Sequence, residues 1–277
     1  MRSARFVWVL CLSLAVPAWG QQAPQSQTPP PPDNKDLLWF PHPAQDPQAV
    51  QAVLRAINAL GGTEAIQQSQ NYIVQAQVSP SSRSQAEAGQ AIWTLAGGQI
   101  RVDLPSPKGT NTLSSGNGQP FWIIHGNPAQ AISPHVVRPA FAPALVASLL
   151  LSELQGTNYS IQFIGSQSLG SELVTVVDIS CQASRMESLV TPQRWYFDIA
   201  SNLPVRIDYH SPDVKWISRF MHAELFLSDY QAISGVLYPF QIVRWFNGQQ
   251  SDTLTITSIQ TNPNIPASSF SAPGGVQ

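Results

Sequence analysis

The chain has 277 residues, with 14 Lys or Arg against 16 Asp or Glu, so its formal net charge is −2. Charged residues make up 11% of the chain, less than half of the roughly 25% usual in soluble proteins. Nucleic-acid binding requires a basic surface that neutralises phosphates. The composition therefore predicts no nucleic-acid partner.

The N-terminus has the features of a secretory signal peptide. Two arginines precede an apolar run from Phe6 to Val16, and the small residues of Ala18-Trp19-Gly20 suit a cleavage site. We predict that residues 1–20 are a cleaved signal peptide and that the mature protein is periplasmic. No later segment has the ~20 consecutive apolar residues of a transmembrane helix, so we predict no membrane span in the mature protein.

The mature chain divides into a leader and one domain. Residues 21–45 are rich in Gln and Pro, which predicts a disordered tether, either a spacer near an envelope surface or a tail without function. Residues 46–277 are expected to form a single domain. Since Cys181 is the one cysteine outside the signal peptide, no internal disulfide can form and stability must come from a hydrophobic core.

The domain begins with a predicted amphipathic helix. Asp46 suits its N-cap, Pro47 its first turn, and Gly61-Gly62 its end. One apolar stripe must pack on another element: Val50, Val53, Leu54 and Ile57. A second short helix is expected from Thr63 to about Gln68.

From Asn71 onward the hydrophobic period is two, which predicts β-strands. Short turn-forming segments such as Ala96-Gly97-Gly98 and Ala200-Ser201-Asn202 join neighbours, so the strands should be antiparallel with one wet and one buried face. About eleven strands are expected, near residues 71–78, 90–95, 99–104, 121–125, 160–164, 172–181, 193–199, 203–210, 222–228, 236–246 and 253–260.

A second apolar helix is predicted between Pro139 and Gln155, where Leu145, Leu149 and neighbouring leucines follow helical spacing. It is either a buried connecting helix or a lid that contacts a ligand. We take Leu145 and Leu149 as candidate ligand contacts.

Aromatic residues are concentrated in the predicted strands. A curved sheet would place them on its concave face around a ligand, whereas a sandwich would pack them against each other. The candidate cavity residues are Trp93, Phe163, Trp195, Phe197 and Trp245.

The sequence lacks the residue patterns typical of catalytic sites. The five histidines are scattered singly, without the spacing of metal ligands, and Ser166 of Gly165–Gly170 stands where a nucleophile elbow needs glycine. Cys181 ends an apolar strand without a signature of activation. The late-strand acids Asp198, Asp208, Glu224 and Asp229 are expected at strand ends or turns. We predict no catalytic residue, no metal and no cofactor, and therefore no enzyme.

Four short segments and the order of the elements resemble the LolA/LolB-like periplasmic lipoprotein carriers and the related sensor RseB. The segments are Gly98–Asp103, Asp198-Ile199 with Asn202–Val205, Asp229-Tyr230 with Gly235-Val236 and Pro239-Phe240, and the ending with Ile259, Asn262, Asn264, Ile265-Pro266, Phe270 and Pro273. The resemblance implies a mainly β fold, in which a single large curved antiparallel sheet forms a half-open β-barrel closed by helices. The long Pro-rich leader departs from the compact carriers.

The resemblance implies a non-catalytic periplasmic carrier or binding protein for a lipid or a lipoprotein acyl chain. An alternative is an envelope sensor or scaffold that uses the same fold to bind a protein partner. A third hypothesis is an envelope hydrolase built on the late-strand acids.

Overall fold

The computed structural model describes residues 43–82, 88–105, 107–116, 119–132, 142–184, 187–188, 191–212 and 220–274. The predicted signal peptide and most of the predicted tether lie outside these ranges. The last residues of the tether segment, Ala44 and Gln45, lie on a strand edge: the Ile161 amide donates to the Ala44 carbonyl at 2.9 Å, and the Asp46 amide donates to the Ile161 carbonyl at 2.8 Å.

The first helix forms where the sequence predicts it. Helix α1 spans Pro47–Ala59, and the Asp46 carboxylate accepts a hydrogen bond from the Gln48 amide at 2.7 Å. This contact satisfies one of the amides that a helix N-terminus leaves without a partner. The short helix α2 follows at Gly62–Gln68.

The mid-chain helix is shorter than predicted. Helix α4 spans Val146–Gln155, and Leu145 is its N-cap rather than a residue of the helix. The predicted start at Pro139 lies outside the described residues. Among the helices of the described ranges, none has both the length and the hydropathy needed to cross a membrane.

The described strands form one antiparallel sheet of thirteen strands in the order β6-β5-β4-β3-β2-β1-β13-β12-β11-β10-β9-β8-β7. Their bounds are β1 Tyr72–Pro80, β2 Gly89–Ala96, β3 Gln99–Leu104, β4 Asn111–Ser114, β5 Phe121–Ile123, β6 Gln130–Ala131, β7 Tyr159–Leu169, β8 Glu172–Cys181, β9 Gln193–Asp198, β10 Pro204–Pro212, β11 Phe220–Ile233, β12 Val236–Phe246 and β13 Gln249–Thr261. The predicted antiparallel sheet is confirmed, and β4 and β6 are the two strands that the sequence pattern did not indicate.

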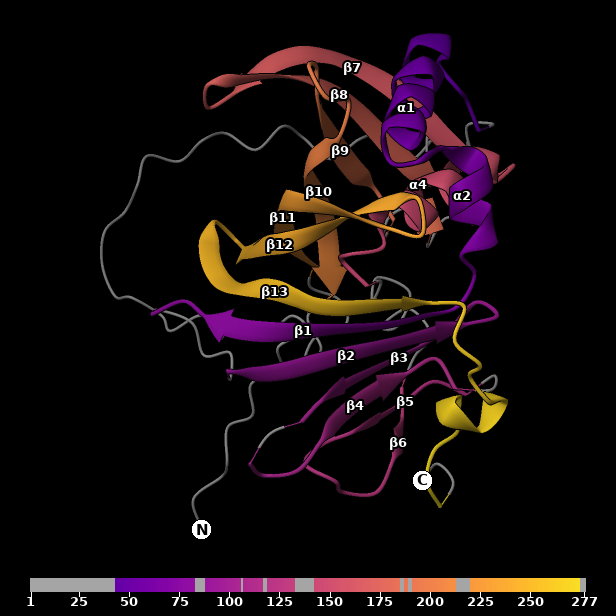
Figure 1. Cartoon of the computed structure of the whole chain (residues 1–277), viewed down its shortest axis with the longest axis vertical. Coiled ribbons are helices and arrows are strands. Elements are labelled where there is room, and N and C mark those ends of the chain that lie inside the picture. Colours follow the sequence, from indigo (N-terminus) through magenta and orange to yellow (C-terminus); the bar gives the residue numbers. More distant parts are fainter. Residues whose placement is uncertain are drawn as a thin grey trace, which may run out of the picture.

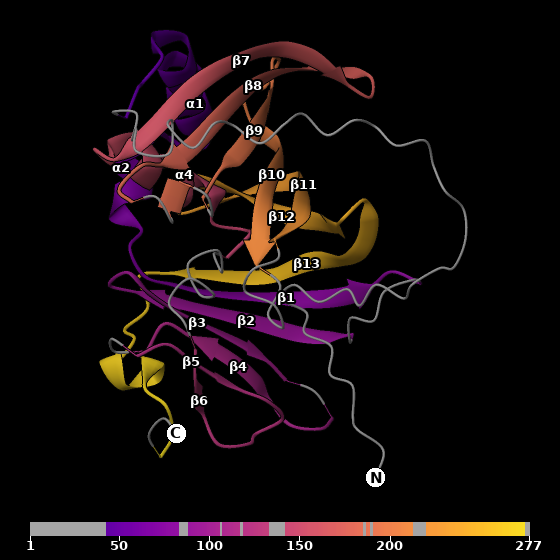
Figure 2. The ribbon, with the colours of Figure 1, turned by 180° about the vertical axis from the view of Figure 1, so that it is seen from behind.

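The sheet is strongly curved and open. Strand direction changes steadily along it, so that β10 runs across the direction of β13 and β1 (Figure 1). The strands β6 and β7 are the two edges and do not pair with each other. The view from behind shows α1, α2 and α4 gathered at one end of the upper half of the sheet (Figure 2). The predicted half-open barrel is confirmed.

The helices pack on one face of the sheet, which we call the inner face. One continuous core joins the buried side of α1, including Val53 and Ile57, to strand residues such as Val74, Trp195 and Leu225. The opposite, outer face is covered near β3 by the C-terminal segment, where the Arg101 guanidinium donates to the Ser269 carbonyl at 3.0 Å. The helices thus close the concave side of the sheet, and no second sheet packs against it in the parts of the chain that the structure describes.

Candidate functional site

Three of the predicted cavity residues lie together in the core of the inner face. Trp93, Trp195 and Phe197 are buried, and the rings of Trp195 and Phe197 stack with centroids 6.1 Å apart and an interplanar angle of 13°. Leu145 at the start of α4 is buried in the same core. In this structure these four side chains pack against protein atoms.

Two buried polar atoms of this core, the indole Nε1 of Trp93 and the hydroxyl oxygen of Tyr238, form no hydrogen bond within the described part of the chain. Leaving a buried donor without an acceptor costs about 1–3 kcal/mol. An oxygen atom brought into the core by a ligand would supply such an acceptor.

The two remaining inner-face candidates lie at the margin of this core. Leu149 of α4 and Phe163 of β7 are half-buried and pack against the core from outside. They are therefore the candidates that solvent or a ligand reaches without any movement of the helices.

A groove separates α1 from β7 and β8, with a volume of about 450 Å³. We call it the α1 groove; it is lined by Pro47, Gln48, Gln51, Arg55, Phe163, Ser166 and Thr175. Phe163 and Thr175 supply apolar atoms from the sheet, whereas the glutamines and Arg55 come from the solvent side of α1. Sequence reasoning identified Phe163 here but missed Arg55, because a single arginine on the polar face of a helix gives no local signal.

Helix α4 carries a buried acid that sequence reasoning also missed. Glu153 is buried, and one of its carboxyl oxygens accepts a hydrogen bond from the Gln193 side-chain amide of β9 at 2.7 Å. Burial raises the pKa of Glu153 to about 8, although the bond from Gln193 acts in the opposite direction. At neutral pH the side chain is therefore protonated, and it links α4 to the sheet.

Trp245 does not lie with the other candidates. It is on the outer face, where its ring meets the Phe226 ring edge-on at a centroid distance of 6.2 Å. The guanidinium of Arg206 lies 5.0 Å from the centre of the Phe226 ring. Trp245 thus belongs to a surface cluster of aromatic and charged side chains.

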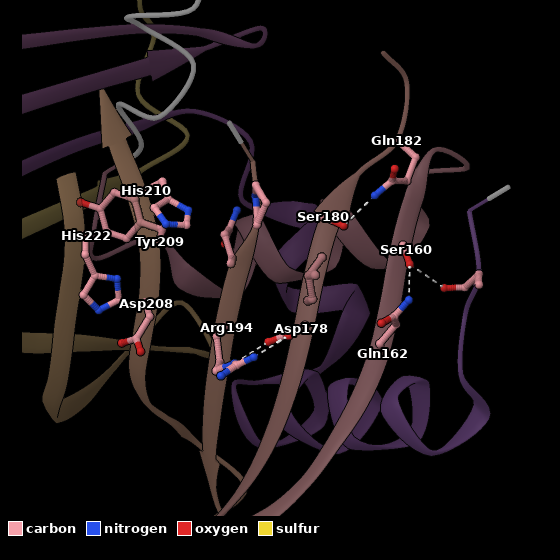
Figure 3. Close-up of a pocket in the computed structure, with 14 residues that line it drawn as sticks. Ser160, Gln162, Asp178, Ser180, Gln182, Arg194, Asp208, Tyr209, His210 and His222 are labelled. Atoms are coloured by element: carbon pink, nitrogen blue, oxygen red, sulfur yellow. Dashed lines mark hydrogen bonds and ion pairs between the residues drawn. The ribbon is translucent and has the colours of Figure 1, made fainter. Parts of the chain in front are cut away.

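Figure 3 shows a polar pocket of about 440 Å³ on the outer face, across β7 to β11. Arg194 donates two hydrogen bonds to the Asp178 carboxylate, at 2.7 and 2.8 Å. On β10 and β11, His210 and His222 are cross-strand partners with ring centroids 6.3 Å apart. In the part of the chain that the structure describes, no three His, Cys, Asp or Glu side chains are grouped so that they could hold a metal ion.

The late-strand acids have structural contacts. Asp208 and Glu224 face each other on β10 and β11, and both pair with Arg206, at 2.6 and 3.0 Å. Asp198 accepts hydrogen bonds from the hydroxyl and amide of Ser201, which lower its pKa. Asp229 is an exposed residue of β11 with a φ of 53°. The structure thus brings two of the four acids together, as counter-ions of one arginine.

Comparison with solved structures places this architecture among known folds. The chain superposes on a LolA superfamily protein from Nitrosomonas europaea with a TM-score of 0.54 and 12% identity, over 80% of this chain and 97% of that one. The two chains thus share one fold. A DUF1329 family protein from Desulfovibrio piger is similar to the same degree, with a TM-score of 0.53 and 13% identity, over 80% of this chain and 95% of that one. No protein-family profile matches the sequence, and no curated protein matches it.

Proposed function

We propose that this chain is an exported, non-catalytic carrier or binding protein for a lipid or a lipoprotein acyl chain. The observation that carries the proposal is the open, strongly curved sheet, whose apolar inner face is closed by helices alone within the described residues. A helix makes its backbone hydrogen bonds within itself, so it can leave such a face without breaking them, and an apolar ligand can offset the lost apolar contacts.

The free energy lost when α4 leaves the core is similar in size to the free energy gained when an acyl chain is buried in its place. Helix α4 buries Val146, Leu150 and Leu151 against the core, and three such side chains contribute about 5–9 kcal/mol. About ten methylene groups of an acyl chain would contribute about 8 kcal/mol when buried in the same place. The exchange of α4 for a ligand is therefore close to balanced, which a carrier requires because it must also release its cargo.

Replacement of Leu149 by Asp tests this role of α4. Leu149 is half-buried at the edge of the core, so we expect the change to lower lipid occupancy more than it lowers the melting temperature. Protein purified from the periplasm would be measured by native mass spectrometry and by organic extraction, next to thermal unfolding. Ser152→Asp, at an exposed position of the same helix, is the matched control.

If Leu149→Asp lowers lipid occupancy and thermal stability equally, α4 is an ordinary core helix without a role in ligand binding. Lipid-free protein that takes up no lipid would contradict the carrier function itself.

Export is part of the proposal. The charged start, the apolar run and the small residues before Gln21 support cleavage at that point. The mass of the mature protein recovered from the periplasm tests it, since a chain that keeps residues 1–20 would contradict it.

A protein-binding sensor or scaffold is the second candidate, and the polar pocket of the outer face favours it. Its Ser and Gln side chains and its paired charges offer hydrogen bonds to a peptide (Figure 3). Recovery of one stable protein partner together with lipid-free material would support this role over transport.

A further inference from the structure

Three large apolar side chains of the described residues are exposed on neighbouring strands, and two of them, Leu173 and Ile199, are adjacent. The three are Ile164, Leu173 and Ile199, with 48%, 52% and 42% of their surface exposed. They lie on β7, on β8 and directly after β9, and the Ile199 amide donates to the Leu173 carbonyl at 3.0 Å. Exposed apolar groups that cluster, rather than scatter singly, mark an interaction site.

This apolar surface continues into the α1 groove. Thr175, which lines the groove, is two residues from Leu173 on β8 and therefore on the same face of the strand. A chain-like apolar ligand could thus lie in the groove and extend over Leu173 and Ile199 without displacing a helix.

The groove also carries a cation, Arg55, that has no counter-ion among the described residues. Arg55 is exposed on α1. The nearest acid along the helix, Asp46, is nine residues away, or about 13 Å at 1.5 Å per residue, and its carboxylate caps the helix through Gln48. An anionic group is therefore the chemical complement of this end of the groove, and arginine binds carboxylates through two parallel hydrogen bonds.

We propose that the α1 groove binds one long-chain fatty acid, with the carboxylate on Arg55 and the hydrocarbon tail on Phe163, Leu173 and Ile199. This site rests on the proposed lipid-binding function and deepens it, because it names the ligand class and a position outside the closed core. A volume of about 450 Å³ is near the lower end of the roughly 300–1,000 Å³ of small-molecule sites. It suits one acyl chain better than the several chains of a lipoprotein.

The experiment measures displacement of a dansyl-labelled undecanoic acid by palmitate and by hexadecanol, which has the same chain length and no charge. We expect Arg55→Gln to weaken palmitate binding at least about tenfold, as loss of a charge-assisted bond does, and to leave hexadecanol binding unchanged. Phe163→Asp should weaken both ligands. Arg194→Gln, which removes an exposed arginine from the outer face, should change neither.

Two results would contradict fatty-acid binding in the α1 groove and still be consistent with the proposed lipid-binding function. One is palmitate affinity that does not change in Arg55→Gln. The other is a palmitate affinity lost in Leu149→Asp but kept in Phe163→Asp, which would place the chain in the core beneath α4. Circular dichroism of each variant reports whether it is folded, and Arg55→Gln serves alone if Phe163→Asp does not fold. If the unaltered protein binds neither palmitate nor hexadecanol, the groove and the proposed function both fail.

Discussion

Replacement of Glu153 by Gln isolates the acid that links α4 to the sheet. In the folded protein burial raises the pKa of Glu153 to about 8, against an ordinary value of 4.5. Between these two values the folded protein holds a proton that the unfolded chain has released. Unfolding then releases that proton, so this group's contribution to stability is complete below about pH 4.5 and is lost as the pH rises towards 8.

The magnitude follows from the separation of the two pKa values. Within this window the free energy of unfolding falls by up to about 1.36 kcal/mol for each pH unit, or about 2–3 kcal/mol from pH 5 to pH 7. Gln has the shape of the protonated acid and can still accept the bond from Gln193, but it does not titrate. The variant should therefore gain about 2–3 kcal/mol relative to the unaltered protein over the same range.

Urea unfolding of both proteins at pH 5, 6, 7 and 8, with linear extrapolation to water, measures this difference. Other groups that titrate contribute equally to the two proteins and cancel. A difference between variant and unaltered protein that stays constant from pH 5 to pH 8 would refute the reasoning, because it would mean that Glu153 is ionised in the folded state.

Two further predictions concern stability and use the same urea measurement. Arg244→Met should cost about 3–5 kcal/mol, because it leaves the fully buried Asp252 without the guanidinium that now lies 2.6 Å away; a loss under 1 kcal/mol would show that water reaches the carboxylate. Gly61→Ala should destabilise more than Gly62→Ala, since both positions have positive φ but only at Gly61 would a Cβ clash with a backbone oxygen, that of Gly235. Equal losses in the two alanine variants would contradict that contact.

The sequence predicted the elements that local rules determine. The start of α1 followed from Asp46 and Pro47, whose capping roles depend on their immediate neighbours alone. Most strands followed from alternation, since one face of the sheet is buried and the other is wet. Strand β4 could not be found in this way, because all four residues of Asn111–Ser114 are buried and no alternation is left to detect.

The second half of β7 shows how a neighbouring strand overrides local composition. The Gly165–Gly170 segment is rich in Gly and Ser, which is typical of a hairpin loop, yet the strand continues to Leu169. Pairing with β8 from Val176 to Glu172 supplies the backbone hydrogen bonds, and a bulge between Phe163 and Gly165 takes up the irregularity. The turn itself is confined to the residues around Gly170, whose φ is 62°.

Trp245 points outward because its neighbour Arg244, a charged residue, points toward the inner face of the sheet. Alternation along β12 indicates only which residues share a face, and a charged residue such as Arg244 is normally assigned to the wet one. Here Arg244 points inward because Asp252 of β13 meets it there, and its neighbour Trp245 must therefore point outward. Trp93, Trp195 and Phe197 are packed inside the core. A ligand can therefore directly reach the two inner-face candidates at the margin of the core, Leu149 and Phe163. The lipid-binding tests depend on these two residues.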